Sequence, residues 1–171
     1  TDPWEQRKLY DFSQKVSERN DSLKPLITLT NSAEFGIIKQ LDFFDKSISS
    51  SKNIKNYYVV KPAYFVYNPR ISKNAPFGPI NLNELNVTGI MSPLYMVFKT
   101  EGIDIYFLKY YFKSSNWHYY MYSNGDSGAR SDRFSINTSI FFQMQLYVPQ
   151  KSEQTKIGKM LKKIDKLIAA N

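Results

Sequence analysis

Hydrophobic and aromatic residues in this 171-residue chain gather in short runs, separated by turns rich in proline, glycine and asparagine. The runs are rich in tyrosine and β-branched residues, which favours strands over helices. Pro62 and Pro93 separate neighbouring runs, because proline lacks the N–H that a sheet needs. The predicted strands are 26–30, 57–60, 63–67, 87–91, 94–99 and 145–148.

Other stretches predict helices. Residues 104–112 are too densely apolar for a solvated strand and are long enough for a helix, and 137–144 predict a second, shorter one. Residues 43–54 are polar and serine-rich, which predicts a mixture of helix and loop. The sum is an α+β domain, in which a mainly antiparallel, tyrosine-rich sheet carries flanking helices.

The stretch 149–171 has a different period. Four apolar residues recur at intervals of four, three and four positions, as on one helical face or a coiled-coil seam: Ile157, Leu161, Ile164 and Ile168. Ser152 is the predicted N-cap of this long C-terminal helix. No Gly or Pro closes the run before Asn171, and the chain begins with Thr1. We therefore expect the chain to be one piece of a longer protein.

Positive charge is concentrated in two places. The net charge is +8, and the segment from Lys151 onward supplies +4 of it, with six lysines against Glu153 and Asp165. Within the remaining body, residues 39–73 carry seven basic and two acidic residues, a local charge of +5. Such an excess is typical of a polyanion-binding protein, and a solvated lysine-rich surface explains the charge equally well.

The composition argues against several kinds of site. The chain has no cysteine and a single histidine, His118, which excludes a His/Cys zinc site. There is no Gly-x-Ser-x-Gly elbow and no phosphate loop, so we expect His118 to be a packed or surface side chain. Asn68-Pro69-Arg70 is only superficially similar to the Asn-Pro-Pro-Tyr motif of adenine methyltransferases. We interpret it as a turn that ends a strand, and we expect no catalytic residue and no metal site.

Two loops carry residues suited to contact a nucleic acid. The first, at 68–79, holds Arg70, Lys73 and Asn74, and the second, at 123–133, is glycine-rich and holds Arg130, Ser131 and Arg133. Arginine can form paired hydrogen bonds with a guanine edge or with a phosphate. The alternative is a surface hairpin in which arginine and aspartate pair with one another.

Several segments, in order along the chain, resemble the specificity subunits of type I restriction–modification enzymes. Trp4-Glu-Gln-Arg-Lys-Leu9 resembles their entry motif, and Gly89-Ile-Met-Ser-Pro-Leu-Tyr-Met-Val-Phe98 matches their Gly-x-x-Ser-Pro-x-Tyr-x-x-Phe pattern. Tyr57-Tyr-Val-Val60 with Phe65-Val-Tyr-Asn-Pro69 resembles their central strand pair. Gly128-Ala-Arg130 and the start of the helix after Pro149 also match. The ordered set covers nearly the whole chain and is specific.

The resemblance implies a target recognition domain over 1–149 and the start of a conserved coiled-coil spacer helix over 150–171. Such a domain is not an enzyme: it binds one half of a bipartite double-stranded DNA target and positions the methylation subunit and, through it, the restriction subunit. The implied partners also include the second recognition half of the parent protein. S-adenosylmethionine, ATP and Mg would belong to partner subunits, and the chain itself would need no cofactor. The expected location is the cytoplasm, without a membrane.

Residue roles follow as expectations. Lysines supply phosphate contacts, which fix register without sequence information: Lys39, Lys46, Lys52, Lys55 and Lys73. The candidates for contacts with base edges are Arg70, Asn74, Arg130, Ser131 and Arg133. The apolar seam of the terminal helix is expected to pair with another helix. Two alternatives stay open: a recognition domain of a fused restriction–methylation enzyme, and a non-nucleic-acid module such as a carbohydrate-binding protein, against which the basic loops argue.

Overall fold

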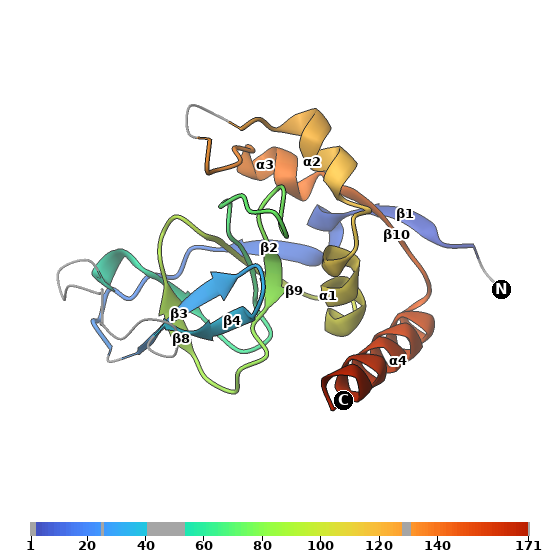
Figure 1. The fold of residues 1–171 in the computed structure, drawn as a ribbon, viewed down its shortest axis with the longest axis horizontal. Coiled ribbons are helices and arrows are strands. Elements are labelled where there is room, and N and C mark those ends of the chain that lie inside the picture. The colour runs from blue at the N-terminus through green and yellow to red at the C-terminus, as the bar shows by residue number, and fades with distance from the viewer. Residues whose placement is uncertain (1–2, 25, 41–53, 128–130, 171) are drawn as a thin grey trace. The chain divides into compact units, whose positions relative to one another are not determined.

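The computed structural model of the chain describes residues 3–24, 26–40, 54–127 and 131–170, so most of the stretch 43–54 lies outside the described residues. The chain divides into two compact units. The terminal unit comprises Thr1–Ser13, Thr100–Asp126 and Ile136–Asn171, and the sheet unit comprises Gln14–Lys99 and Ser127–Ser135. Figure 1 gives the element labels of both units.

Two four-stranded sheets make up most of the sheet unit. In one, the strand order is β2 (Ser13–Val16), β9 (Met96–Thr100), β6 (Phe65–Tyr67), β7 (Ile80–Leu82). In the other, the order is β4 (Gly36–Lys39), β3 (Ile27–Ser32), β8 (Gly89–Met91), β5 (Tyr58–Val60). β3 and β8 pair in parallel, whereas β3/β4, β5/β8, β6/β7 and β6/β9 pair antiparallel. The predicted strands and their antiparallel character are therefore confirmed, but they do not form a single sheet.

The core of the sheet unit is built from the inward faces of these strands. β6 is buried along its whole length, because a strand lies on each side of it and both of its faces are covered. Phe65 of β6 is the register partner of Phe98 of β9, and their rings stack with centroids 5.4 Å apart. A neighbouring cluster consists of Val16, Leu29, Ile37, Val60, Val66, Met91 and Val97.

The α-helices of the described part of the chain lie in the terminal unit. β1 (Glu5–Lys8) pairs antiparallel with β10 (Gln145–Val148), and the 3₁₀ helix η1 (Leu9–Phe12) follows β1. The α-helices are α1 (Ile105–Lys113), α2 (His118–Asn124), α3 (Thr138–Phe142) and α4 (Lys151–Ala169). The helices predicted from 104–112 and 137–144 and the closing strand are thus confirmed. None of the helices in the described part of the chain is long and apolar enough to cross a membrane.

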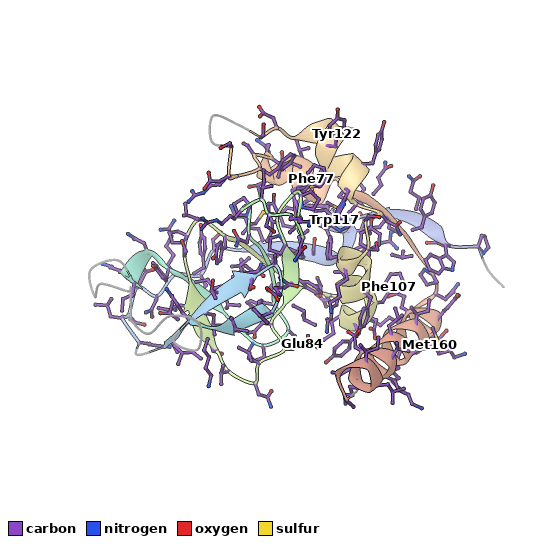
Figure 2. All side chains as sticks on the ribbon, viewed as in Figure 1. Phe77, Glu84, Phe107, Trp117, Tyr122 and Met160 are labelled. Carbon is purple, nitrogen blue, oxygen red and sulfur yellow. The ribbon has the colours of Figure 1, made fainter. Side chains whose placement is uncertain are left out.

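The second loop begins later than the sequence predicts. Ser123 and Asn124 are not loop residues, since they end α2. The helix extends this far because Met121 is fully buried and its carbonyl accepts a hydrogen bond from the backbone N–H of Gly125, at 2.9 Å. Tyr122 of the same helix is 73% exposed (Figure 2).

Within the terminal unit, α1 packs against α4. The Oδ1 atom of Asp104 caps α1 by accepting hydrogen bonds from the backbone N–H groups of Tyr106 and Phe107, both at 3.0 Å. The buried Gln154 of α4 joins the two helices, because its Oε1 accepts from the Asp104 N–H at 2.9 Å. Further along, the Tyr110 hydroxyl donates to Asp165 at 2.7 Å and holds the pKa of that carboxyl below its ordinary value.

The N-cap predicted for the terminal helix is wrong by two residues. α4 begins at Lys151 with Gln150 as its N-cap, and Ser152 lies inside the first turn. The Gln150 carbonyl already accepts from the N–H groups of Glu153 and Gln154, at 2.9 and 3.0 Å. Gln150 keeps an extended ψ of 146° directly after β10 and Pro149, so the helix starts as soon as the strand has ended.

The four apolar residues of the predicted helical seam differ in their exposure to solvent. Ile157 and Leu161 are half-buried, whereas Ile164 is 43% and Ile168 is 68% exposed. Helix α1 lies along α4 in the same compact unit. The division into a recognition domain over 1–149 and a spacer helix over 150–171 stays a prediction. The pairing of the exposed end with another helix stays a prediction.

Candidate nucleic-acid interface

The first predicted loop and the end of the second, residues 131–133, lie side by side in the sheet unit. Arg70, two residues after the buried Asn68, forms an isolated antiparallel bridge with Arg133. The Ile71 N–H donates to the Asp132 carbonyl at 2.9 Å, and the Phe134 N–H donates to the Pro69 carbonyl at 2.8 Å. Residues more than sixty positions apart therefore meet, and the structure brings the candidates Arg70 and Arg133 together.

The pattern of these hydrogen bonds orients the two arginines. Both bonds flank the Arg70–Arg133 pair, which makes it a non-hydrogen-bonded pair, with Cα atoms typically about 4.5 Å apart and side chains on one face. Phe134, which follows Arg133 in the chain, meets Phe77 (Figure 2) edge to face, with ring centroids 5.1 Å apart. Among the described residues, no carboxylate forms an ion pair with either arginine.

Lys73 and Asn74 occupy the tip of a tight hairpin next to the bridge. The N–H of Ser72 donates to the Ala75 carbonyl at 3.0 Å, and the Ala75 N–H returns a bond of 3.1 Å. Both tip side chains are exposed, as is Ser131 in the neighbouring segment. The first loop thus presents one cation and one amide at adjacent positions of a fixed turn.

Buried asparagines hold the base of the first loop. The Asn68 Oδ1 accepts from the Arg70 N–H at 3.0 Å, and its Nδ2 donates to the Asn31 carbonyl at 3.0 Å. Asn31, which is 2% exposed, donates to the Val66 and Pro79 carbonyls at 2.8 and 3.3 Å. The network positions the backbone of Arg70 from β3. Sequence analysis missed it, although a polar residue continuing an apolar strand run, as Asn31 does, was a usable signal.

Two further features keep this loop in one conformation. Gly78 has a φ of +86°, and a Cβ there would lie 2.0 Å from the carbonyl oxygen of Asn68. The Tyr67 hydroxyl donates to the Phe77 carbonyl at 2.7 Å, and burial raises the pKa of that hydroxyl far above its ordinary value. The backbone of the loop that carries Arg70 is therefore restrained by hydrogen bonds and by close packing.

A cavity of about 250 Å³ opens beside Arg70. Hydroxyl groups and amides make up most of its polar lining, and Arg70 is the single charged residue among those that line it. The lining residues are Thr30, Asn31, Ser32, Ala33, Asn68, Arg70, Ile71, Ser72, Pro79 and Tyr95. The sequence analysis did not select Thr30, Ser32 or Tyr95, because nothing local marks a strand hydroxyl as facing a cavity. The cavity is rich in donors and holds no carboxylate.

The remaining candidates lie elsewhere. Lys39 is exposed at the end of β4, and Lys55 is exposed in the 3₁₀ helix η3 (Ile54–Asn56), and neither lines the cavity. Lys46, Lys52 and Arg130 lie outside the described residues.

His118 begins α2 and is half-buried, with its ring edge-on to Trp117 at 4.7 Å between centroids. Burial lowers the pKa of this imidazole. In the part of the chain that the structure describes, no three His, Cys, Asp or Glu side chains gather in a way that could hold a metal ion.

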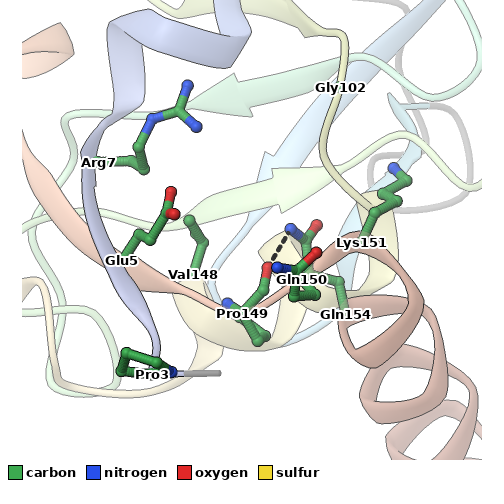
Figure 3. Close-up of a pocket in the computed structure, with 9 residues that line it drawn as sticks. All are labelled: Pro3, Glu5, Arg7, Gly102, Val148, Pro149, Gln150, Lys151 and Gln154. Carbon is green, nitrogen blue, oxygen red and sulfur yellow. Dashed lines mark hydrogen bonds between the residues drawn. The ribbon is translucent and has the colours of Figure 1, made fainter. Parts of the chain in front are cut away.

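A second cavity, of about 210 Å³, lies in the terminal unit where β10 passes into α4. Figure 3 shows its charged lining residues Glu5, Arg7 and Lys151, and the hydrogen bond of 2.8 Å from the Gln154 Nε2 to the Pro149 carbonyl. It contains none of the residues predicted to contact DNA. Gln154, which lines this cavity, stabilises the turn between β10 and α4 through its hydrogen bond to the Pro149 carbonyl.

Taken together, these features define an α+β module in which two basic loop segments meet at the Arg70–Arg133 bridge. Residues 1–171 match the family model described as type I restriction modification DNA specificity domain, so the chain belongs to this family. No curated protein gives a sequence match.

Two similar solved structures have the same fold. One is a chain from work on the structural basis underlying complex assembly and conformational transition of the type I R-M system, with a TM-score of 0.67 and 10% identity. The alignment covers 99% of this chain and 44% of that chain. The other is the HsdS subunit from Thermoanaerobacter tengcongensis, with a TM-score of 0.56 and 16% identity, covering 98% of this chain and 39% of that one. The chain thus spans less than half the length of either structure.

Proposed function

We propose that this chain recognises one half of a bipartite DNA target as part of a type I restriction–modification specificity subunit. The observation that carries the proposal is the bridge between Arg70 and Arg133, which joins two separate basic loops on a rigid base. Family membership supports the same reading. The chain would perform no chemistry of its own. It would position a methylation subunit and, through it, a restriction subunit, which would carry S-adenosylmethionine, ATP and Mg.

The two kinds of DNA contact are divided among the exposed residues. Lys73, Lys39 and Lys55 are exposed cations that would contact phosphates and fix the register of the domain on the duplex. Asn74 and Ser131 have short polar side chains that can exchange hydrogen bonds with base edges in the major groove. Sequence preference would therefore come from the loop tips, and most of the affinity from the surrounding lysines.

The direct test is a salt titration of duplex binding by the whole chain. A log–log plot of the association constant against salt is expected to fall with a slope of several, since each neutralised phosphate releases counterions and contributes about 0.9. Fluorescence anisotropy with a labelled duplex of about 20 base pairs measures this slope, and selection from a random-sequence pool then gives the preferred bases. Absence of duplex binding at low salt would refute the proposed function.

The hairpin tip offers a matched pair of variants. Asn74→Ala is expected to lose roughly 1–3 kcal/mol of discrimination at one base position of the selected duplex, with little change for a scrambled one. Lys73→Ala is expected to weaken both duplexes alike and to reduce the salt slope by about one. Because the two residues are neighbours on one turn, each variant controls for general disturbance of the loop. Equal loss on both duplexes for Asn74→Ala would contradict its role in base recognition.

A further inference from the structure

Arg70 and Arg133 are two like charges at directly opposite positions of an antiparallel pair, an arrangement that is normally unfavourable. In a non-hydrogen-bonded antiparallel pair the side chains are close, and like charges directly opposite each other repel. Neither Arg70 nor Arg133 has an acidic partner among the described residues. Two adjacent cations without an internal counterion form a site at which an anion relieves the repulsion.

The cavity beside Arg70 adds hydrogen-bond donors to these charges. The Ser32 Oγ accepts from the N–H groups of Glu34 and Phe35, both at 3.2 Å, so its own hydrogen is left to donate. The Thr30 and Tyr95 hydroxyls lie 3.3 Å apart, and their mutual bond uses only one of two hydroxyl hydrogens. By contrast, the Nδ2 of Asn31 already donates to two backbone carbonyls, so both of its hydrogens are used within the fold.

From this donor set we propose that the cavity and the arginine pair form a binding site for one phosphate group, a phosphodiester of the DNA backbone. Arg70 lines the cavity and Arg133 stands opposite it, so a phosphate at the cavity mouth accepts from both guanidiniums and from the hydroxyls of Thr30, Ser32 or Tyr95. This inference rests on the proposed function. It also replaces the expectation that Arg70 and Arg133 contact base edges, and it leaves base recognition to the loop tips.

The duplex arm of the test uses the whole chain with a 20-base-pair duplex of random sequence. The double variant Arg70→Gln/Arg133→Gln is expected to reduce the salt slope by about one, because the two arginines share one phosphate. Each single variant is expected to account for most of that reduction. Lys61→Gln is the matched control: it removes a cation from the same unit, but one already paired with Glu18 at 3.0 Å, and the slope should stay unchanged.

Other outcomes overturn the inference in distinct ways. A slope reduced by about two would mean that the arginines contact separate phosphates. An unchanged slope, together with lost preference for the selected duplex over the random one, would make them base contacts. If the wild-type chain bound no duplex at all, the proposed function would fail, whereas a bound duplex with an unaltered slope in the double variant would refute only the phosphate site.

The second arm uses inorganic phosphate alone. Replacing chloride by phosphate at equal ionic strength is expected to raise the melting temperature of the wild-type chain and not that of the double variant. The double variant should melt no lower than wild type in chloride, because it removes a repulsion and leaves the asparagine network intact. Stabilisation by phosphate together with an unchanged duplex slope would assign the site to free phosphate and overturn the DNA assignment.

Discussion

Gly78→Ala is expected to lower the free energy of unfolding of the sheet unit by roughly 3 kcal/mol or more. The left-handed backbone at φ +86° costs an alanine about 1–2 kcal/mol, and the new Cβ would lie 2.0 Å from the Asn68 carbonyl oxygen. Relieving that overlap requires a backbone shift, for which overpacking costs of about 1–3 kcal/mol are typical. Urea denaturation followed by far-UV circular dichroism and tyrosine fluorescence measures the loss.

Gly36→Ala is the matched control for this variant. Gly36 also has a positive φ, +71°, but the nearest atom to an added Cβ is the Cγ of Asn81 at an ordinary 4.0 Å. The free energy of unfolding of this variant should fall only by the cost of the left-handed backbone, about 1–2 kcal/mol. Similar losses for both variants would show that the contact with Asn68 is not what the glycine provides.

Gly78→Ala should also affect DNA binding beyond its effect on stability. The carbonyl that the Cβ would displace belongs to Asn68, whose side chain holds the Arg70 N–H at 3.0 Å. At a temperature where the variant is folded, duplex affinity is therefore expected to fall, while Gly36→Ala should retain it. Preserved affinity in a folded Gly78→Ala chain would mean that the loop tolerates displacement of its base.

Individual helices and strands of this fold can be predicted from the residues within and next to them. The dense apolar run at 104–112 predicts α1, and Asp104, the first residue of that run, is the N-cap of the helix and not its first helical residue. The strands around Val59 and Val66 follow from β-branched and aromatic residues bounded by turns. Each of these elements is specified by residues within one or two turns of one another.

The candidate site is different because its parts meet only through pairing between distant segments. Nothing in the sequence around Arg70 indicates that Arg133 will lie opposite it, since register between distant strands has no local signature. The cavity residues Thr30 and Tyr95 face each other for the same reason. In the terminal helix, periodicity identified the apolar face but not its neighbour, and so it could not show that α1 covers one part and leaves Ile168 exposed.

Gly158→Val is expected to destabilise the terminal unit by roughly 2–4 kcal/mol. A Cβ at Gly158 would lie 2.7 Å from the Asp104 Oδ1 and 3.0 Å from the Phe107 N and the Tyr106 Cβ. The Asp104 Oδ1 and the Phe107 N belong to the cap of α1, so the variant combines overpacking, about 1–3 kcal/mol, with loss of an N-cap, about 1 kcal/mol. Intrinsic helix propensity points the other way, since glycine is the poorer residue inside a helix. A loss of stability would therefore report the packing of α1 on α4.

Lys159→Val is the control, because it places the same β-branched residue at the next, exposed position of α4. It should change the stability by less than about 0.5 kcal/mol, as surface substitutions usually do. Duplex affinity and salt slope should be unchanged in both variants, since the loops that we propose to bind DNA belong to the sheet unit. Hydrogen exchange should show lost protection in α1 and α4 for Gly158→Val alone. Loss of duplex binding in a folded Gly158→Val chain would contradict this separation, and would mean that the α1–α4 pair takes part in holding the DNA.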